Sequence, residues 1–281
     1  MKFQVFSELE YIVPVPTTFI FNLHAARTSH QTVIEETLTI DPVYQCKEFS
    51  SANRESRFTQ LCVNDKINFK ITYSAIVDLH YNKIDPQQLS PAVSVMDLDL
   101  DVIQYLYPSR YCQSDKLERL ARKEFDHLEN EYEKVLAINE WIYNNVEYIG
   151  GSTNSGTSAH DTLTERVGVC RDFAHLAIAL CRAISIPARY FTAYAYNLFP
   201  PDFHACFEAY IGGQWVFFDP TKLVPANGII KISNGRDAAD ASVATIFGET
   251  TCTSIIVKCE SLDPAYKPYY IHNSDPNEKY M

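Results

Sequence analysis

Cys170 lies where the sequence could create a reactive thiol. Gly168 interrupts the preceding segment and an apolar stretch then runs to Pro187, which predicts a helix that starts at or within one residue of Cys170. The first turn of a helix has free backbone N–H groups and carries the positive end of the helix dipole, so it favours a thiolate over a thiol. Cys170 therefore meets the first requirement of a nucleophilic cysteine.

A histidine that could serve this thiol lies downstream, on a predicted strand. Apolar and polar residues alternate over residues 202–211, the period of a β-strand, and His204 and Cys206 share its polar face. Gly212-Gly213 is a two-residue hairpin signal, and residues 214–219 return as the partner strand. The chain therefore predicts a hairpin that carries His204 on one arm.

The register of this hairpin decides what faces His204. A loop at Gly212-Gly213 makes Asp219 the diagonal neighbour of His204, and a loop at Ile211-Gly212 makes the two residues direct partners. Both registers put the two side chains on the same face, whereas a slip of one residue would separate them. The sequence leaves the choice between the two registers open.

A cysteine at a helix start, a histidine and an aspartate form the set required for acyl transfer. The imidazole takes or shares the thiol proton, the carboxylate orients the imidazole, and the helix start supplies an oxyanion donor. We therefore predict a catalytic triad of Cys170, His204 and Asp219. The second oxyanion donor stays open among three ring N–H or phenol groups, which belong to Trp141, Tyr148 and Tyr190.

The residues around this triad resemble the transglutaminase-like superfamily, in its bacterial cysteine protease branch. The resemblance rests on residues 168–176, His204 and residues 219–221, and flanking stretches extend it over roughly residues 107–250. It implies an α+β fold, in which a papain-like core with the nucleophile helix packed on an antiparallel sheet follows an N-terminal β-sandwich-like domain. It also implies a peptide or protein substrate and no metal or organic cofactor.

The resemblance leaves the reaction open between hydrolysis by a protease or amidase and transfer to an amine. We favour hydrolysis, because an amine transferase must exclude water and no feature of the sequence predicts such a shield. The zinc-binding cysteine pairs that accompany this core in peptide N-glycanase relatives are absent from the sequence, which disfavours deglycosylation. The alternative from another class is a catalytically silent transglutaminase-like scaffold or protein-binding module.

A metal site is the other chemical interpretation of the same residues. Cys170, His204, Cys206 and Asp219 could converge on an ion, but the chain has no zinc spacing of the C-x2-C or H-x3-H kind. No EF-hand-like loop is visible either. We therefore expect no metal, and we expect Cys206 to pack beside His204 rather than to act.

Composition limits the partners. The 281 residues suit one or two domains, and a formal charge of -11 with a pI near 5.2 weighs against nucleic acid or an anionic membrane as a partner.

The first residues have no apolar leader region and no run of about 18 apolar residues occurs, so we expect a cytoplasmic protein. Eight scattered cysteines in such a chain predict free, mostly buried thiols. The oligomeric state cannot be inferred from the sequence.

Periodicity divides the chain near residue 106. Residues 1–106 predict an N-terminal β-rich domain, with strands at residues 17–23, 32–40, 57–63 and 67–79. Residues 107–281 predict the catalytic domain, with a late strand at residues 253–257. Two helix starts follow the boundary: a capping box of Asp115 with Glu118, and an N-cap at Asn130 with Glu133.

Overall fold

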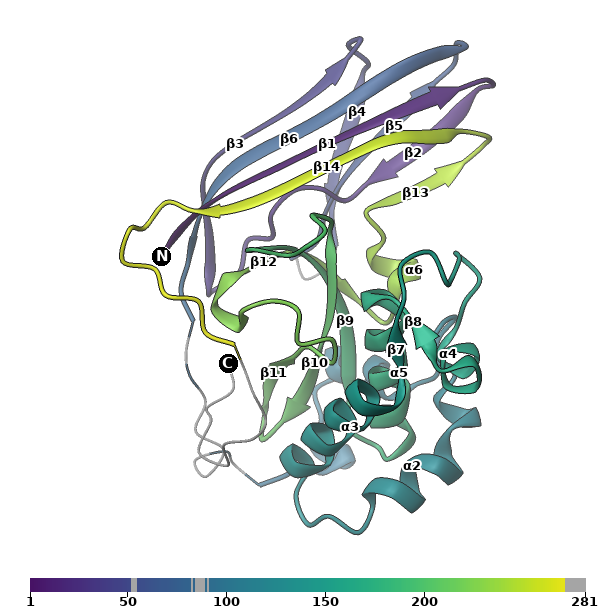
Figure 1. Cartoon of the computed structure of the whole chain (residues 1–281), viewed down its shortest axis with the longest axis vertical. Coiled ribbons are helices and arrows are strands. Elements are labelled where there is room, and N and C mark those ends of the chain that lie inside the picture. Colours follow the sequence, from purple (N-terminus) through teal and green to yellow (C-terminus); the bar gives the residue numbers. More distant parts are fainter. Residues whose placement is uncertain (52–54, 82, 84–88, 90, 271–281) are drawn as a thin grey trace.

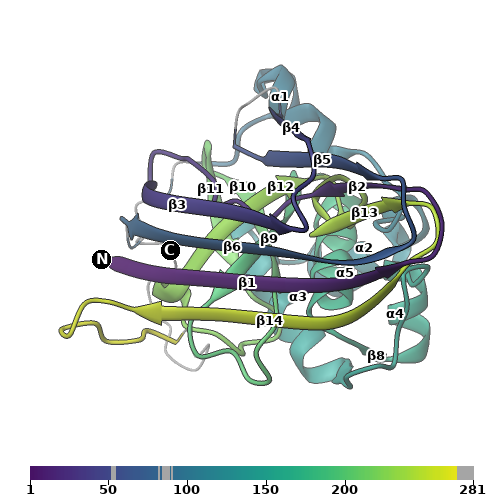
Figure 2. The same ribbon diagram turned by 90° about the horizontal axis from the view of Figure 1, so that it is seen from above.

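Alternating apolar and polar residues build two long strands that form the centre of the first sheet. β1 (Lys2–Val13) and β6 (Ile67–Leu79) pair antiparallel from Lys2↔Asp78 to Val13↔Ile67, and alternate residues of both are buried. β14 (Thr251–Ser261) and β3 (Gln31–Asp41) flank them, so the order is β14-β1-β6-β3 (Figure 2). The computed structural model describes residues 1–51, 55–81, 83, 89 and 91–270.

A second antiparallel sheet completes a sandwich. Its order is β13-β2-β5-β4, from strands β13 (Ala244–Phe247), β2 (Thr17–Phe21), β5 (Arg57–Val63) and β4 (Cys46–Ser50). Tyr11 and Phe69 of the first sheet contact Phe19 and Phe21 of the second, with ring centroids 5.0–6.2 Å apart. The predicted β-rich N-terminal region is therefore a β-sandwich with an aromatic core.

The end of the chain returns to this sandwich, which corrects part of the predicted domain division. β14 pairs with β1 from Phe3↔Ser261 to Ile12↔Thr251, and β13 pairs with β2. Residues 244–261, assigned by sequence to the catalytic domain of residues 107–281, therefore belong to the two sheets of the sandwich (Figure 1). The boundary near residue 106 itself stays a prediction.

A third antiparallel sheet, of order β11-β10-β9-β12, forms the centre of the other part of the molecule. Its strands are β9 (Ala188–Ala195), β10 (His204–Ile211), β11 (Gln214–Phe218) and β12 (Ile229–Gly235). Ala205, Phe207 and Ala209 of β10 join the buried residues of α5 (Cys170–Ala183) in one core cluster. The predicted α+β architecture, with the nucleophile helix on an antiparallel sheet, is confirmed.

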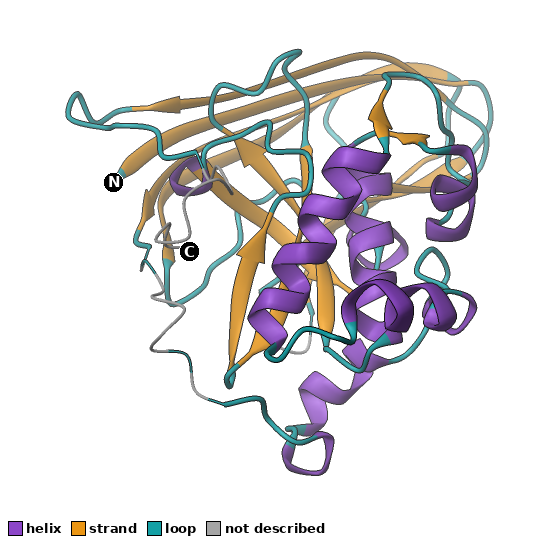
Figure 3. Ribbon diagram, turned by 60° about the horizontal axis from the view of Figure 1, so that its bottom comes forward, coloured by secondary structure: helices purple, strands orange, loops and turns teal. Residues whose placement is uncertain are grey.

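The other described helices are α1 (Leu100–Ile103), α2 (Glu118–Phe125), α3 (Glu131–Asn145), α4 (Ala159–Glu165) and α6 (Ala238–Ala241). Three of them, α2, α3 and α4, pack against α5, and Figure 3 shows most of the helices gathered together on one side of the molecule. Among the described residues no helix is long and apolar enough to span a bilayer.

The two predicted helix starts have different outcomes. Asn130 caps α3, because its Oδ1 accepts the Glu133 backbone N–H at 2.8 Å. The predicted capping box of Asp115 and Glu118 is wrong. A 3-10 turn occupies Ser114–Lys116, and α2 begins at Glu118 with Leu117 as an N-cap that makes no side-chain bond.

Hydrogen bonds join the sandwich to the third sheet. The Tyr194 hydroxyl of β9 is 2.9 Å from Ser7 Oγ and donates to the Leu23 carbonyl at 2.7 Å. The Gln31 side chain donates to the Lys231 carbonyl and accepts the Lys231 N–H, both at 2.8 Å. The sandwich is therefore attached directly to the strands that carry the polar residues described below.

Candidate active site

Local structure places Cys170 at the start of its helix, as predicted. β8 (Val167–Gly168) precedes α5, and Val169 is the N-cap. Any side chain at Gly168 would lie 2.8 Å from the Asp172 Cβ, so this tight approach requires glycine. Cys170 is the first residue of α5 and is partly exposed. Its backbone N–H is one of the free donors of the first turn.

Asp172 and Arg171 fix this helix start. Asp172 Oδ2 accepts the Val169 N–H at 3.0 Å and the Thr153 hydroxyl at 2.6 Å. Arg171 binds Asp172 Oδ1 and donates to the Asn154 carbonyl at 2.8 Å. The loop that contains Thr153 and Asn154 is thereby held against the nucleophile helix, where it borders the site.

The structure selects one of the two hairpin registers. Ile211 pairs with Gln214, and the loop residues Gly212 and Gly213 both have positive φ, at 59° and 85°. His204 is therefore the diagonal neighbour of Asp219, and His204 Nε2 lies 3.0 Å from Asp219 Oδ2. Both residues are buried.

Asp219 is itself held in place. Its other oxygen, Oδ1, accepts the Thr221 backbone N–H at 2.9 Å and the Thr221 hydroxyl at 2.7 Å. Because both oxygens have partners, the carboxylate has a fixed orientation and accepts from the Nε2–H of His204. The second ring nitrogen, Nδ1, is not bound to Asp219 and can therefore exchange a proton with another group.

Nδ1 of His204 is buried, and no described residue meets it at hydrogen-bonding geometry. Burial is the largest influence on the imidazole and would lower its pKa. The neighbouring Cys206 and Asp219, and then Cys170, outweigh burial and raise the pKa of His204 well above its usual value. The ring therefore favours the imidazolium form beside the Cys170 thiol.

Cys206 shares the face of β10 with His204. Its Sγ, a ring nitrogen of His204 and a carboxylate oxygen of Asp219 lie within 4.8 Å of one another, close enough for a metal ion. Burial raises the pKa of the Cys206 thiol to about 12, and a metal would need its thiolate. The carboxylate oxygen nearest the imidazole is also engaged by Nε2. This donor set therefore fits a histidine–carboxylate pair with a neutral thiol beside it better than it fits a metal.

The position of Tyr148 separates it from the other two oxyanion-donor candidates. β7 (Glu147–Tyr148) pairs in parallel with β8, where Tyr148 lies opposite Gly168, and the Ile149 N–H donates to the Gly168 carbonyl at 3.0 Å. Burial first, and then Cys170, raise the pKa of the Tyr148 phenol to about 12, so the phenol keeps its proton.

Trp141 and Tyr190 are less exposed than Tyr148. The Trp141 ring packs against Phe125 and lies under the Arg166 guanidinium at 4.7 Å. Tyr190 is buried under α5 against His175, with ring centroids 5.1 Å apart. Burial first, and then Cys170, also raise the pKa of the Tyr190 phenol. Tyr148 is exposed and lies opposite Gly168, and it is therefore the best placed of the three.

The other titratable groups near the helix have structural roles. His175 is fully buried, its Nε2 accepts the Ala238 N–H at 3.1 Å, and burial lowers its pKa to about 3. Apart from Cys170 and Cys206, three cysteines are buried and three are exposed, so the expectation of mostly buried thiols holds only in part. All eight are free, and the exposed ones are Cys46, Cys62 and Cys252.

Comparisons with known proteins agree with this architecture. A family model described as a bacterial transglutaminase N-terminal domain matches residues 1–101, and one described as the transglutaminase-like superfamily matches residues 118–220. The crystal structure of a "putative cysteine protease" from Cytophaga hutchinsonii is 57% identical, with a TM-score of 0.96, over 100% of this chain and 96% of that chain.

Two mycobacterial relatives are more distant. Uncharacterized protein ML0607 of Mycobacterium leprae is 25% identical over 263 residues, which cover 86% of this chain and 91% of that protein. Uncharacterized protein Rv2569c of Mycobacterium tuberculosis is 36% identical over 115 residues, which cover 35% of this chain and 36% of that protein. The relative from Cytophaga hutchinsonii, in contrast, covers the whole of this chain and so matches both the sandwich and the third sheet.

Proposed function

Because the chain belongs to the transglutaminase-like superfamily, we propose that it is a cysteine-dependent enzyme that cleaves peptide or side-chain amide bonds through a thioester. Cys170 is the nucleophile, His204 the general acid and base, and Asp219 the residue that orients the imidazole. The observation that carries this proposal is the His204–Asp219 pair: Nδ1 of His204, which has no hydrogen-bond partner among the described residues, lies beside a thiol at a helix start.

The first half of the reaction uses the charges already described. The Cys170 thiolate attacks the amide carbonyl, the C–N bond breaks, and the imidazolium of His204 gives its proton from Nδ1 to the leaving amine. Asp219 holds Nε2 throughout, because Thr221 fixes the carboxylate. In the second half, water gives a proton to the neutral imidazole and attacks the thioester, which releases the acid and restores the thiolate.

Developing charge on the carbonyl oxygen requires two donors. The backbone N–H of Cys170 is one, as a free donor of the first turn of α5. We assign the phenol of Tyr148 as the second, since it keeps its proton and interacts with Cys170. These donors act on the transition state more than on the substrate, so they should contribute to kcat.

Hydrolysis is the favoured outcome over amine transfer. The relative from Cytophaga hutchinsonii at 57% identity is described as a "putative cysteine protease", which supports this direction. Cys170 is partly exposed, so water can approach the thioester. Peptide and protein substrates, a reaction without metal or organic cofactor, and a cytoplasmic location stay predictions from the sequence.

The test is to incubate the protein with a proteome-derived peptide library and to identify new termini and deamidated glutamines by mass spectrometry. A parallel reaction contains dansylcadaverine as an amine acceptor. We expect new carboxyl groups with wild type and none with Cys170→Ala. Labelling by dansylcadaverine in place of hydrolysis would reassign the enzyme as an amine transferase. The same products from wild type and Cys170→Ala would refute the proposed chemistry and favour the scaffold function.

A further inference from the structure

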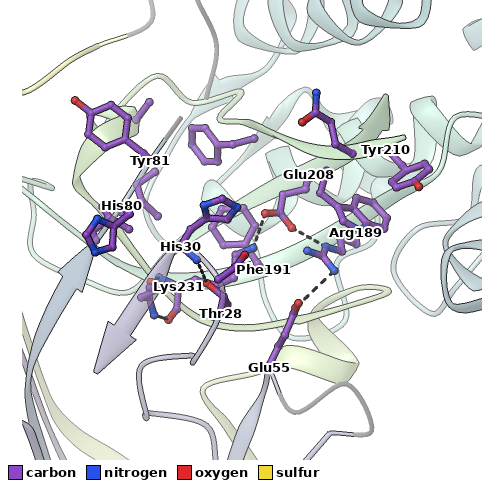
Figure 4. A pocket seen from close by; sticks show the side chains of 18 of the residues that line it. Thr28, His30, Glu55, His80, Tyr81, Arg189, Phe191, Glu208, Tyr210 and Lys231 are labelled. Carbon is purple, nitrogen blue, oxygen red and sulfur yellow. Dashed lines mark hydrogen bonds and ion pairs between the residues drawn. The ribbon is translucent and has the colours of Figure 1, made fainter. Parts of the chain in front are cut away.

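A second polar site lies on the third sheet, away from Cys170. It is a pocket of about 450 Å³ between the sandwich and the face of the sheet opposite α5, and both parts of the molecule line it (Figure 4). Strands β9 to β12 form one side. Residues 28–31 and the end of β6 with His80 and Tyr81 form the other. A hollow of this size can enclose a small organic molecule.

The pocket is separate from the candidate active site. Glu208 lies four residues beyond His204 on β10, about 13 Å along the strand. Cys206 and Phe191, covered by Val224 and partly buried Leu223, form an apolar cluster between them. A ligand in the pocket would therefore not touch the Cys170 thiol.

Three charges from three strands form the floor: Arg189 and Glu208 are buried, and Lys231 is partly buried. Glu208 Oε2 accepts from Arg189 Nε at 2.6 Å, and Oε1 accepts from Lys231 Nζ. Burying such a triad costs desolvation energy that apolar residues would avoid, so its presence is not explained by stability. It places two cations around one carboxylate, in a chain whose formal charge is -11.

The hydrogen-bonding groups of the pocket floor that remain for a ligand are N–H donors. Both oxygens of Glu208 are occupied, and Glu55 at the edge lies 3.6 Å from Arg189 and accepts from the Asn234 amide. Lys231 differs, because Glu208 is the one partner that its ammonium has among the described residues, and its side chain is 16% exposed. Two of its three N–H donors therefore remain for a ligand.

Aromatic rings surround these charges. Lys231 Nζ lies 4.9 Å from the centre of the Phe191 ring, and the Arg189 guanidinium lies 4.2 Å from the centre of the Trp215 ring. Phe217 also lines the pocket, and His30 and His80 lie on the side of the sandwich (Figure 4). The walls thus offer flat apolar surfaces, with further ring N–H groups from the histidines.

From this arrangement we propose that the pocket binds a small organic carboxylate with an apolar or aromatic body. The carboxylate binds the free donors of Lys231, and the body packs against Phe191, Phe217 and Trp215. A cationic ligand is disfavoured, because both carboxylates of the lining are already paired with protein donors. An uncharged oxygen could also accept from Lys231, but a hydrogen bond from an ammonium to a carboxylate is stronger.

The test uses 4-phenylbutyrate as the probe and the fluorescence of Trp215 as the readout, in a Trp141→Phe background. The chain has two tryptophans, so Trp215 alone then reports. We expect a saturable change with 4-phenylbutyrate, and at least about tenfold weaker binding of 4-phenylbutyramide and 4-phenylbutylamine. Equal binding of all three probes, or no binding of the carboxylate, would overturn the proposal.

Amino-acid substitutions test whether 4-phenylbutyrate binds in this pocket. Lys231→Met should weaken the binding of 4-phenylbutyrate at least about tenfold. Lys222→Met is the matched control, because Lys222 is also 16% exposed and also pairs with a glutamate, outside the pocket. Cys170→Ala should bind the probe as wild type does. Loss of binding in Cys170→Ala would assign the probe to the active site and refute the separate pocket.

A measurement without a variant covers the case in which Lys231→Met does not fold. Acetic anhydride acetylates lysines of the wild-type protein, and mass spectrometry gives the acetylation rate of each lysine. We expect 4-phenylbutyrate to slow labelling of Lys231 at least about fivefold, as occupied donors would, and to leave Lys222 unchanged. Equal rates at Lys231 with and without the probe would contradict the proposal.

Discussion

Strand β10 carries two buried ionic clusters on one face, and they differ in what they leave unpaired. At its start, His204 pairs with Asp219 through Nε2, and no described residue meets the buried Nδ1 at hydrogen-bonding geometry. Further along, Glu208 has partners for both oxygens. Other buried polar atoms among the described residues, such as Nδ1 of His175, also lack a partner, so it is the position of His204 Nδ1 beside the Cys170 thiol that supports the proposed catalytic function of this cluster.

The clusters also differ in their charge preferences. The neighbours of His204 raise its pKa, which favours the imidazolium. Burial would raise the pKa of Glu208, but Arg189 and Lys231 outweigh it and lower that pKa to about 2. The first cluster can exchange a proton during a reaction, whereas the second stays fully charged at neutral pH. This contrast agrees with the catalytic function proposed for the first cluster and the binding function proposed for the second.

The largest expected effect is that of His204→Ala on the reactivity of Cys170. In wild type the imidazolium persists through neutral pH because its pKa is raised, so Cys170 should react with iodoacetamide below pH 7. We expect His204→Ala to slow this alkylation at pH 6 by a factor of 100 or more, and to lower peptide cleavage by about 10⁴. Mass spectrometry of each cysteine gives the rates.

The controls for this experiment come from the same chain. Cys46 and Cys62 are exposed and should alkylate equally in wild type and His204→Ala. Glu208→Gln should leave the alkylation of Cys170 within about threefold of wild type, because that residue lies about 13 Å away along β10. If Glu208→Gln slowed the alkylation of Cys170 as much as His204→Ala does, the two clusters would form one functional unit.

The second expected effect is on stability and concerns Glu208. Its pKa is lower in the folded protein than in the unfolded chain, so its contribution is present above the unfolded value near 4.5 and is lost as pH falls towards 2. A shift of this size corresponds to at most about 3 kcal/mol. Urea unfolding between pH 5 and pH 2 should therefore show a smaller loss of unfolding free energy for Glu208→Gln than for wild type.

The control is Glu140→Gln, which also removes a lysine-paired carboxylate but lies outside the pocket. Its unfolding free energy should follow the wild-type pH dependence more closely than that of Glu208→Gln. Parallel curves for wild type and Glu208→Gln would show that the cluster on the pocket floor titrates like exposed acids, and the contrast between the two clusters would fail.

The third expected effect is that of Tyr148→Phe, which removes one hydroxyl. If the phenol stabilises the oxyanion, kcat for a peptide substrate should fall by about 10- to 100-fold with little change in KM. Alkylation of Cys170 by iodoacetamide forms no oxyanion, so its rate should stay close to wild type. An equal loss in alkylation and peptide cleavage would mean that Tyr148 positions the thiol instead.

Local pattern was sufficient to predict much of the site. β6 and β5 have the predicted bounds, because strict alternation between turn residues leaves little choice of period or register. The Cys170 helix start and the hairpin that brings His204 near Asp219 follow from glycines at fixed places. Such features depend on residues that are close in sequence.

Features that depend on distant pairing were not predictable. Residues 251–261 join β1 at the opposite end of the chain, so their contribution to the sandwich leaves no local signal. The pocket floor needs the strand order β10-β9-β12, which brings Lys231 to Glu208. Tyr148 was one of three candidates until the two-residue strand β7 placed it beside Gly168, and so short a strand has no readable period.

The smallest expected effect, that of Cys206→Ala, tests whether the proposed catalytic residues include Cys206. Cys206 is fully buried beside His204, with its thiol held neutral, so it should pack and not react. We expect cleavage within about fivefold of wild type and a loss of unfolding free energy of about 1 kcal/mol, the cost of a small cavity. Cys181→Ala, which also removes a fully buried thiol, should cost a similar amount without touching the site. A loss of cleavage as large as in His204→Ala would instead make Cys206 a fourth catalytic residue, and only then would the metal interpretation of His204, Cys206 and Asp219 regain support.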